Sequence, residues 1–120
     1  MSLQSVAKQF VDLCNQGKNF DVMRTMYAPG IVSVESTGQE TAGQTPVIQK
    51  SERWASNVTI HSEKVRGPYL HGTSQFAVHF TFDLTLKGSG QRVTQEEIGV
   101  YTVGPDDKIT REQFFNEGNW

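Results

Sequence analysis

Three glutamates stand where they could move protons inside a shared cavity. Glu97 and Glu112 fall in two C-terminal segments in which apolar and polar residues alternate, and Glu35 ends a short β-branched run. Carboxyl groups that share an apolar cavity raise one another's pKa, so one of them could act as a general acid or base near neutral pH. The alternative is that these side chains face solvent or an interface, where cations such as Lys108 neutralise them.

Several further side chains could line the same cavity. Aromatic rings form the walls of many ligand sites, and a tyrosine hydroxyl can donate a hydrogen bond to a ligand carbonyl. The candidates for ligand binding are Phe10, Tyr27, Trp54, His79, Asp83, Tyr101 and Phe114. Structural roles are the alternatives: Trp54 has the helical spacing of ordinary core from Val47, and a strand histidine such as His79 can serve as a hydrogen-bonding residue.

Composition argues against several classes of function. The net charge is −2 and the basic residues are scattered singly, so we expect no nucleic-acid partner. Histidines and acidic residues are not grouped at ligand spacing, and residues 88–90 lack a phosphate-cradling pattern, so we expect no metal and no other cofactor. Cys14 is a single cysteine and cannot form an intramolecular disulfide. With no run of 18 apolar residues and no signal-peptide pattern, we expect a soluble cytoplasmic protein without a membrane partner.

Helical spacing fills the first half of the chain and a period of two fills the second. The spacing predicts a helix between the N-cap Ser2 and Gly17, a second over residues 20–27, and a third that opens at Thr45-Pro46 and ends near Asn57. Strands are expected over residues 31–35, 58–66, 75–87, 91–103 and 108–116, with turns at 67–68, 87–90 and 104–107. Three helices followed by an antiparallel meander indicate one α+β domain over residues 1–120, with the helices packed on the sheet.

The turns decide which side chains share a face of this sheet. Placing Val103 opposite Lys108 and Lys87 opposite Gln91 separates an apolar row from a polar row. The apolar row holds Phe76, Val78, Phe80, Phe82, Leu84, Ile98, Val100, Ile109 and Phe115, with Glu96, Arg111 and Gln113 among them. The polar row includes His79, Asp83, Glu97, Gly99, Tyr101, Glu112 and Phe114. By pattern alone, the apolar row would pack on the helices and the polar row would face solvent.

Several phrases of the sequence resemble a known family. Glu97-Ile-Gly-Val-Tyr-Thr-Val and Lys108-Ile-Thr-Arg-Glu-Gln-Phe-Phe, with Asn15-Gln-Gly-Lys-Asn-Phe-Asp and Tyr27-Ala-Pro-Gly-Ile-Val, are similar to SnoaL-like members of the nuclear transport factor 2-like superfamily. The resemblance covers nearly the whole chain and implies a cone-shaped fold in which a curved sheet and helices enclose one cavity. The best-known enzymes of this family are polyketide cyclases, but the scaffold also hosts isomerases, hydrolases, dehydratases and non-catalytic binders.

The ketosteroid isomerase branch of this superfamily provides one specific mechanism for comparison. Its acidic base matches Glu35, whereas its two oxyanion-hole donors match Phe10 and Gly99, which cannot donate, so steroid isomerase activity is not expected. The cavity-facing aspartate of that branch matches Gly99, which belongs to the polar row. The resemblance therefore implies that the polar row faces the cavity. The apolar row would then be covered by a homodimer through the sheet face. A β-bulge could reverse the parity of any of these strands.

These observations predict a small-molecule-binding protein. As an enzyme it would perform cofactor-free acid/base chemistry of the isomerase, cyclase or dehydratase type on a small apolar carbonyl compound, with Glu35, Glu97 and Glu112 as candidate catalytic residues. The alternatives are a non-catalytic binder that uses the same cavity and a dimeric structural module whose cavity is filled.

Overall fold

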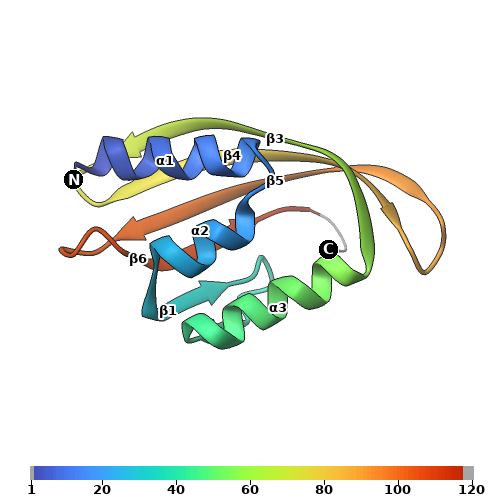
Figure 1. Ribbon diagram of the computed structural model, residues 1–120, viewed down its shortest axis with the longest axis horizontal. Coiled ribbons are helices and arrows are strands. Elements are labelled where there is room, and N and C mark those ends of the chain that lie inside the picture. Colours follow the sequence, from blue (N-terminus) through green and yellow to red (C-terminus); the bar gives the residue numbers. More distant parts are fainter. Residues whose placement is uncertain (1, 118–120) are drawn as a thin grey trace.

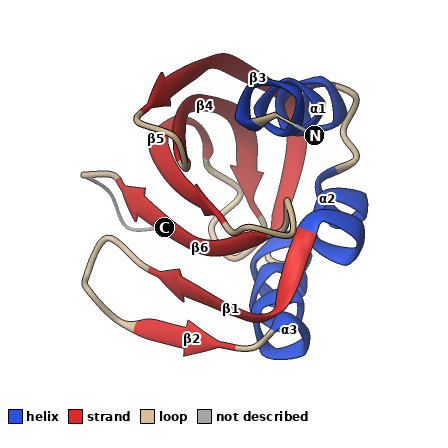
Figure 2. Ribbon diagram, turned by 90° about the vertical axis from the view of Figure 1, so that its left-hand side faces the viewer, coloured by secondary structure: helices blue, strands red, loops and turns tan. Residues whose placement is uncertain are grey.

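The computed structural model describes residues 2–117 and contains three helices and six strands (Figure 1). The elements are α1 (Leu3–Asn15), α2 (Asn19–Met26), β1 (Tyr27–Val34), β2 (Glu40–Ala42), α3 (Gln44–Ser56), β3 (Val58–His71), β4 (Gln75–Leu86), β5 (Arg92–Val103) and β6 (Ile109–Phe115). The helices cover one side of a curved, open sheet, as Figure 2 shows. The predicted α+β fold is therefore confirmed. None of the described helices is long and apolar enough to cross a bilayer.

The sheet has the strand order β2-β1-β6-β5-β4-β3 and is mixed. We expected an antiparallel sheet, but β1 and β6 pair in parallel, with Ser33 opposite Glu112. Alternation of apolar and polar residues shows which side chains of a strand share a face, but not which strand lies beside it. The sequence pattern therefore could not reveal this pairing. The short strand β2, which pairs antiparallel with β1, was not predicted either.

Several element boundaries differ from the prediction, including the start of β1, which begins at Tyr27 inside the segment expected as the second helix. The dipeptide Gly67-Pro68 was expected to end a strand, but β3 continues to His71 and shifts register against β4 between Arg66 and Tyr69. Gly67 has a φ of +125°, a conformation that residues with a side chain rarely adopt, so this irregularity needs glycine. Helix α3 begins at Gln44 with Gly43 as its N-cap, and Thr45 lies inside the first turn.

The hairpin between β4 and β5 is one residue out of the predicted register. The Leu86 N–H donates to the Gln91 carbonyl at 2.8 Å, so residues 87–90 form the loop, and Phe80 lies opposite Glu97. A shift of one residue turns a strand's side chains to the other face relative to its neighbour. The apolar row of β4 therefore shares the inner face with the polar row of β5.

A bulge in β6 also changes which side chains point inward. The register between β5 and β6 shifts where Thr102 pairs with Arg111 but Val103 pairs with Ile109, which leaves Thr110 as an extra residue. Ile109 and Glu112 are consequently both buried, although strict alternation would place them on opposite faces. The inner face thus combines parts of both predicted rows.

Aromatic packing around Tyr101 joins α1 to the inner face of the sheet. The Tyr101 ring centroid lies 4.4 Å from that of Phe10 and 5.2 Å from that of Phe76, which it stacks against at 17°. A Cβ added at Gly99 would lie 2.8 Å from Tyr101 Cε2, closer than real side chains approach. Glycine at this position is what allows the Tyr101 ring to lie flat along β5.

We expect Gly99→Ala to destabilise the protein by about 1–3 kcal/mol, the usual effect of forcing an extra methyl into a packed core. The methyl group would displace the Tyr101 ring from its place beside Phe10 and Phe76. Gly88→Ala is the matched control, because a Cβ at Gly88 meets no atom within 4 Å. Urea unfolding of the two variants measures the difference, and equal stability would contradict this account of Gly99.

Candidate functional site

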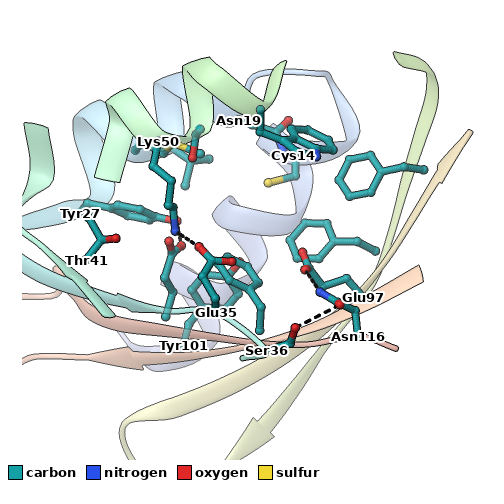
Figure 3. A pocket seen from close by; sticks show the side chains of 18 of the residues that line it. Cys14, Asn19, Tyr27, Glu35, Ser36, Thr41, Lys50, Glu97, Tyr101 and Asn116 are labelled. Carbon is teal, nitrogen blue, oxygen red and sulfur yellow. Dashed lines mark hydrogen bonds and ion pairs between the residues drawn. The ribbon is translucent and has the colours of Figure 1, made fainter. Parts of the chain in front are cut away.

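A cavity of about 770 Å³ lies between the helices and the inner face of the sheet (Figure 3). Its wall includes all the predicted site residues except two: Phe10, Tyr27, Glu35, Trp54, Glu97, Tyr101, Glu112 and Phe114. The polar row of β5 and β6 therefore faces the cavity, as the resemblance implied. Phe80 and Phe82 of the apolar row complete the wall from β4.

The expectation that His79 and Asp83 face this cavity is wrong. Both lie on the outer face of the sheet, because the register of the β4–β5 hairpin differs by one residue from the predicted one. His79 Nε2 lies 3.5 Å from a carboxylate oxygen of Glu96, and Asp83 accepts two hydrogen bonds from Arg92 at 2.8 and 2.9 Å. Asp83 therefore cannot join the carboxyl groups of the cavity.

Glu112 is the most deeply placed carboxyl group, with 1% of its surface exposed. The Tyr27 hydroxyl donates a hydrogen bond to Glu112 Oε1, and Ser33 provides a second hydrogen bond from the neighbouring parallel strand. Burial raises the pKa of Glu112, because desolvation penalises the carboxylate, and the hydrogen bonds from Ser33 and Tyr27 oppose this rise. The predicted candidate Glu112 is thus fixed by two partners.

Lys50 brings a positive charge from α3 into the cavity. This residue was not among the predicted site residues. Its ammonium group donates to Ser33 Oγ at 2.6 Å and forms an ion pair with Glu35. The same Nζ lies 5.6 Å from the centroid of the Phe114 ring, close enough for a cation–π contact. Figure 3 shows Lys50 reaching from the helix toward Glu35.

Helical spacing could have identified Lys50. It lies three residues after Val47 and four before Trp54, the two residues assigned to the inner face of this helix, so it belongs to the same face. The scattered lysines were used to argue against a nucleic-acid partner, and Lys50 was not among the predicted site residues. Ser33, in contrast, gave no signal, because its role depends on the parallel pairing of β1 with β6.

Glu97 lies at the far side of the cavity from Tyr27 and has a different set of partners. Asn116 Nδ2 donates to Glu97 Oε2 at 2.8 Å, and the Ser36 hydroxyl holds Asn116 Oδ1 at 3.1 Å. Burial raises the pKa of Glu97 to about 7; the Asn116 hydrogen bond opposes this rise, and the charges of Glu35 and Glu112 add to it. Asn116 was also missed, because the predicted register placed Phe114 opposite Glu97.

The Tyr101 hydroxyl is a further polar group of the cavity. Burial strongly raises the pKa of Tyr101, so the phenol stays protonated and can donate. It lies 2.9 Å from the point where a Gly99 Cβ would be. Gly99 has no side chain that could donate a hydrogen bond, but its small size makes room for the Tyr101 hydroxyl, which can donate one.

This arrangement places acid/base groups beside a fixed ammonium group in a cavity whose wall combines aromatic and polar side chains. Glu97 has a pKa near the pH of the cell, which suits a group that must both take and give a proton. Lys50 and Tyr101 are donors that could stabilise a developing negative charge. Among the residues that the structure describes, no three His, Cys, Asp or Glu side chains are grouped so that they could hold a metal ion.

Comparison with known proteins gives a consistent picture of the whole chain. The sequence model of the SnoaL-like domain matches residues 1–116. A structure from Mesorhizobium loti, described as that of a candidate SnoaL-like polyketide cyclase and, in brackets, carbohydrate phosphatase, is 39% identical, with a TM-score of 0.90 and coverage of 96% of this chain and 99% of that chain. No curated protein matches the sequence significantly.

Two more distant structures share the fold. A candidate SnoaL-like polyketide cyclase from Jannaschia is 17% identical with a TM-score of 0.77, covering 94% of this chain and 83% of that one. SalBIII, described as an epoxide hydrolase/cyclase-like enzyme in pyran ring formation of the polyether salinomycin, is 15% identical with a TM-score of 0.71, covering 98% and 95%. At these identities the likeness extends to the fold alone.

We expect Asn116→Ala to raise the pKa of Glu97 above its value of about 7. The amide of Asn116 stabilises the carboxylate, so removing it favours the protonated form. A ¹³C NMR titration of the glutamate carboxyl carbons measures the change, with Glu97→Gln identifying the resonance. Ser36→Ala, which only frees Asn116, should move the same pKa less. An unchanged or lowered pKa in Asn116→Ala would contradict the assigned contact.

Proposed function

The chain belongs to the SnoaL-like domain family, and on this premise we propose that it is a cofactor-free enzyme that moves a proton beside the carbonyl group of a small apolar compound. The observation that carries the proposal is the Glu97 carboxyl, which has a pKa of about 7 in a cavity that also holds the Lys50 ammonium. Isomerisation, ring closure and loss of water all begin with such a proton transfer.

Glu97 is the proposed base. Its carboxylate takes a proton from the carbon next to the carbonyl, and the electron pair of that C–H bond moves to form an enolate. The same carboxyl can return the proton to another atom, which isomerises the compound. If the enolate carbon instead attacks a second carbonyl carbon of the same molecule, the new C–C bond closes a ring, the electron pair of that C=O bond moves onto its oxygen, and the oxygen takes the proton from the Glu97 carboxyl. A group with a pKa near the working pH serves both directions of transfer.

Lys50 and Tyr101 are proposed to stabilise the enolate oxygen. Lys50 is held by Ser33 and by Glu35, so its ammonium is already in place before charge develops. Glu35, which matches the acidic base of the ketosteroid isomerase branch, would have to leave this ion pair in order to accept a proton. We therefore assign Glu35, together with Glu112 and its partner Tyr27, a positioning role.

The ligand proposed for this cavity is apolar over most of its surface. Phe10, Trp54 and Phe114 remain predicted ligand contacts, with Tyr27 offering its ring and Tyr101 its ring and hydroxyl. SalBIII, which shares the fold, is described as cyclase-like, and this is compatible with carbonyl chemistry in such a cavity. Location in the cytoplasm stays a prediction.

The proton transfer can be tested without knowing the natural substrate. We expect the protein to catalyse deuterium exchange at the carbon next to the carbonyl of apolar cyclic ketones in D₂O, followed by ¹H NMR. The rate should rise with pH through about 7, because the carboxylate form of Glu97 is the base. Glu97→Gln should lower the rate by about 10²–10⁴-fold, the usual contribution of a positioned base.

Glu96→Gln is the matched control for this experiment. Glu96 is the preceding residue of β5, its side chain is 65% exposed, and it points to the outer face beside His79. Its substitution should leave the exchange rate unchanged. Equal rates in wild type and Glu97→Gln across the ketone panel would refute Glu97 as the base.

A non-catalytic binder is the second candidate, because the three cavity carboxyl groups all have partners within the protein. Glu35 pairs with Lys50, Glu112 with Tyr27 and Glu97 with Asn116. Saturable binding of the same ketones without exchange above the buffer rate would support this function over the enzymatic one.

We also propose a homodimer through the outer face of the sheet. Ile98 and Phe115 lie opposite each other on this face and are about half exposed, and exposed Tyr69 of β3 pairs with Ala77 on the same face. Two buried polar atoms of the same face, His79 Nδ1 and Thr81 Oγ1, have no hydrogen-bond partner among the described residues. A second copy of the chain could cover the apolar side chains and supply the missing partners.

We expect sedimentation equilibrium to show a dimer that Phe115→Glu converts to a monomer, because a carboxylate in an apolar interface costs several kcal/mol. Leu70→Glu is the control: Leu70 is similarly exposed but pairs with buried Phe76, so it belongs to the other face. A monomeric wild type, or a dimer that withstands Phe115→Glu, would exclude this interface.

A further inference from the structure

A second, smaller cavity of about 360 Å³ lies next to the first. It is formed by the α1–α2 connection, the C-terminal half of α3 and the start of β3. Met23, Trp54 and Phe82 belong to the walls of both cavities, as do Asn19 and Ser51. The two cavities are therefore separated by a thin layer of side chains, of which the flexible Met23 can adjust to a ligand.

Glu63 of β3 lines this second cavity and has no role in the proposed proton transfer. Its Oε2 accepts a hydrogen bond from Asn19 Nδ2 at 2.7 Å. Burial raises the pKa of Glu63 to about 7, and the Asn19 bond only partly opposes this rise. The other ionisable groups that sense its charge are the Cys14 thiol and the Tyr101 hydroxyl, both of which are neutral. No cation of the described residues compensates Glu63.

A purely structural role explains Glu63 poorly. The bond to Asn19 does tie β3 to the start of α2, but an amide or hydroxyl at position 63 could form the same link without a buried charge. Placing a carboxyl group away from water without a cation costs stability. A carboxylate without a cation in the protein is typical of a binding site whose ligand carries the compensating positive charge.

The surroundings of Glu63 indicate the chemistry of that ligand. The side chains of Trp54 and Phe82 contribute aromatic walls, whereas the Phe20 ring already has the Arg24 guanidinium 5.8 Å from its centroid, and Glu63 is the sole ionisable side chain among the described residues of the lining. A carboxylate together with aromatic rings favours an ammonium group through charge attraction and cation–π contacts. An anionic group would meet the carboxylate with no counter-charge.

We propose that the second cavity binds the protonated amine of the ligand, whose carbonyl end lies in the first cavity. The substrate class then becomes an apolar carbonyl compound that carries an alkylammonium group, with Glu63 and Asn19 holding that group. The substrate assignment rests on the proposed function, whereas the ammonium site can be tested without it.

The test uses n-butylammonium as the probe and n-butanol as its neutral counterpart, followed by the Trp54 indole resonance in ¹H,¹⁵N NMR. Trp54→Phe identifies that resonance. We expect saturable shifts with n-butylammonium at pH 8, at least tenfold weaker binding at pH 5.5, where Glu63 is protonated, and at least tenfold weaker binding of n-butanol. Glu63→Gln should weaken n-butylammonium binding at least tenfold, whereas Glu96→Gln, on the outer face of the sheet, should leave it unchanged.

Ile60→Lys provides an independent variant at the mouth of the same cavity. Ile60 is 41% exposed, so a lysine is tolerated there, and its charge should repel the probe and weaken binding. The failure of the ammonium site can be distinguished from the failure of the proposed enzyme. Ammonium binding that depends on Glu63, without ketone exchange, would leave this site intact and remove the enzyme. Binding that is equal for n-butanol, or insensitive to both Glu63→Gln and Ile60→Lys, would overturn the ammonium site.

Discussion

The buried carboxyl group of Glu112 is the constraint on which the cavity depends. A carboxyl group that is 1% exposed must have hydrogen-bond partners, since leaving it without them costs several kcal/mol. Its partners are Tyr27 and Ser33, at the two ends of β1, so satisfying Glu112 requires β1 to lie parallel beside β6. Ser33 also accepts from Lys50, which carries the same network into α3. One buried group thus links the two central strands to the helix that closes the cavity.

The cavity carboxyl groups differ in how their charge is compensated, and this difference separates their roles. Glu35 has the full charge of Lys50, and Glu112 has two hydrogen-bond donors. Glu97 has a single amide from Asn116 and the repulsion of the other two carboxyl groups. Burial raises the pKa of Glu97 to about 7, in the range where a carboxyl group can both take and give a proton near neutral pH. The network that fixes two of the carboxyl groups therefore leaves the third free to exchange a proton.

Much of the fold could be predicted from the sequence, because helical spacing in α1 and alternation in β4 and β5 are local signals. The apolar stripe of α1 is buried as expected, with Ser2 as the N-cap that its hydrogen bond to Ser5 confirms. Pairings that depend on distant residues were not accessible: the parallel neighbours β1 and β6 lie more than seventy residues apart along the chain. Asn116 was missed for a similar reason, since its contact with Glu97 depends on a bulge that alternation cannot reveal.

The register of the β4–β5 hairpin determines which side chains of β4 face the cavity. It places His79 and Asp83 on the outer face, and it also sets the surroundings of Glu97. With residues 87–90 as the loop, Phe80 lies directly opposite Glu97 on the inner face. The rings of Phe80 and Phe82 stack at 5.7 Å, so β4 presents a continuous apolar surface to the cavity. In the predicted register, Thr81 would have occupied the place of Phe80 and offered a hydroxyl to the carboxylate. Burial is the largest cause of the raised pKa of Glu97, and Phe80, which lies opposite Glu97, contributes apolar surface to its surroundings. The chemistry of the cavity therefore follows from the length of one loop.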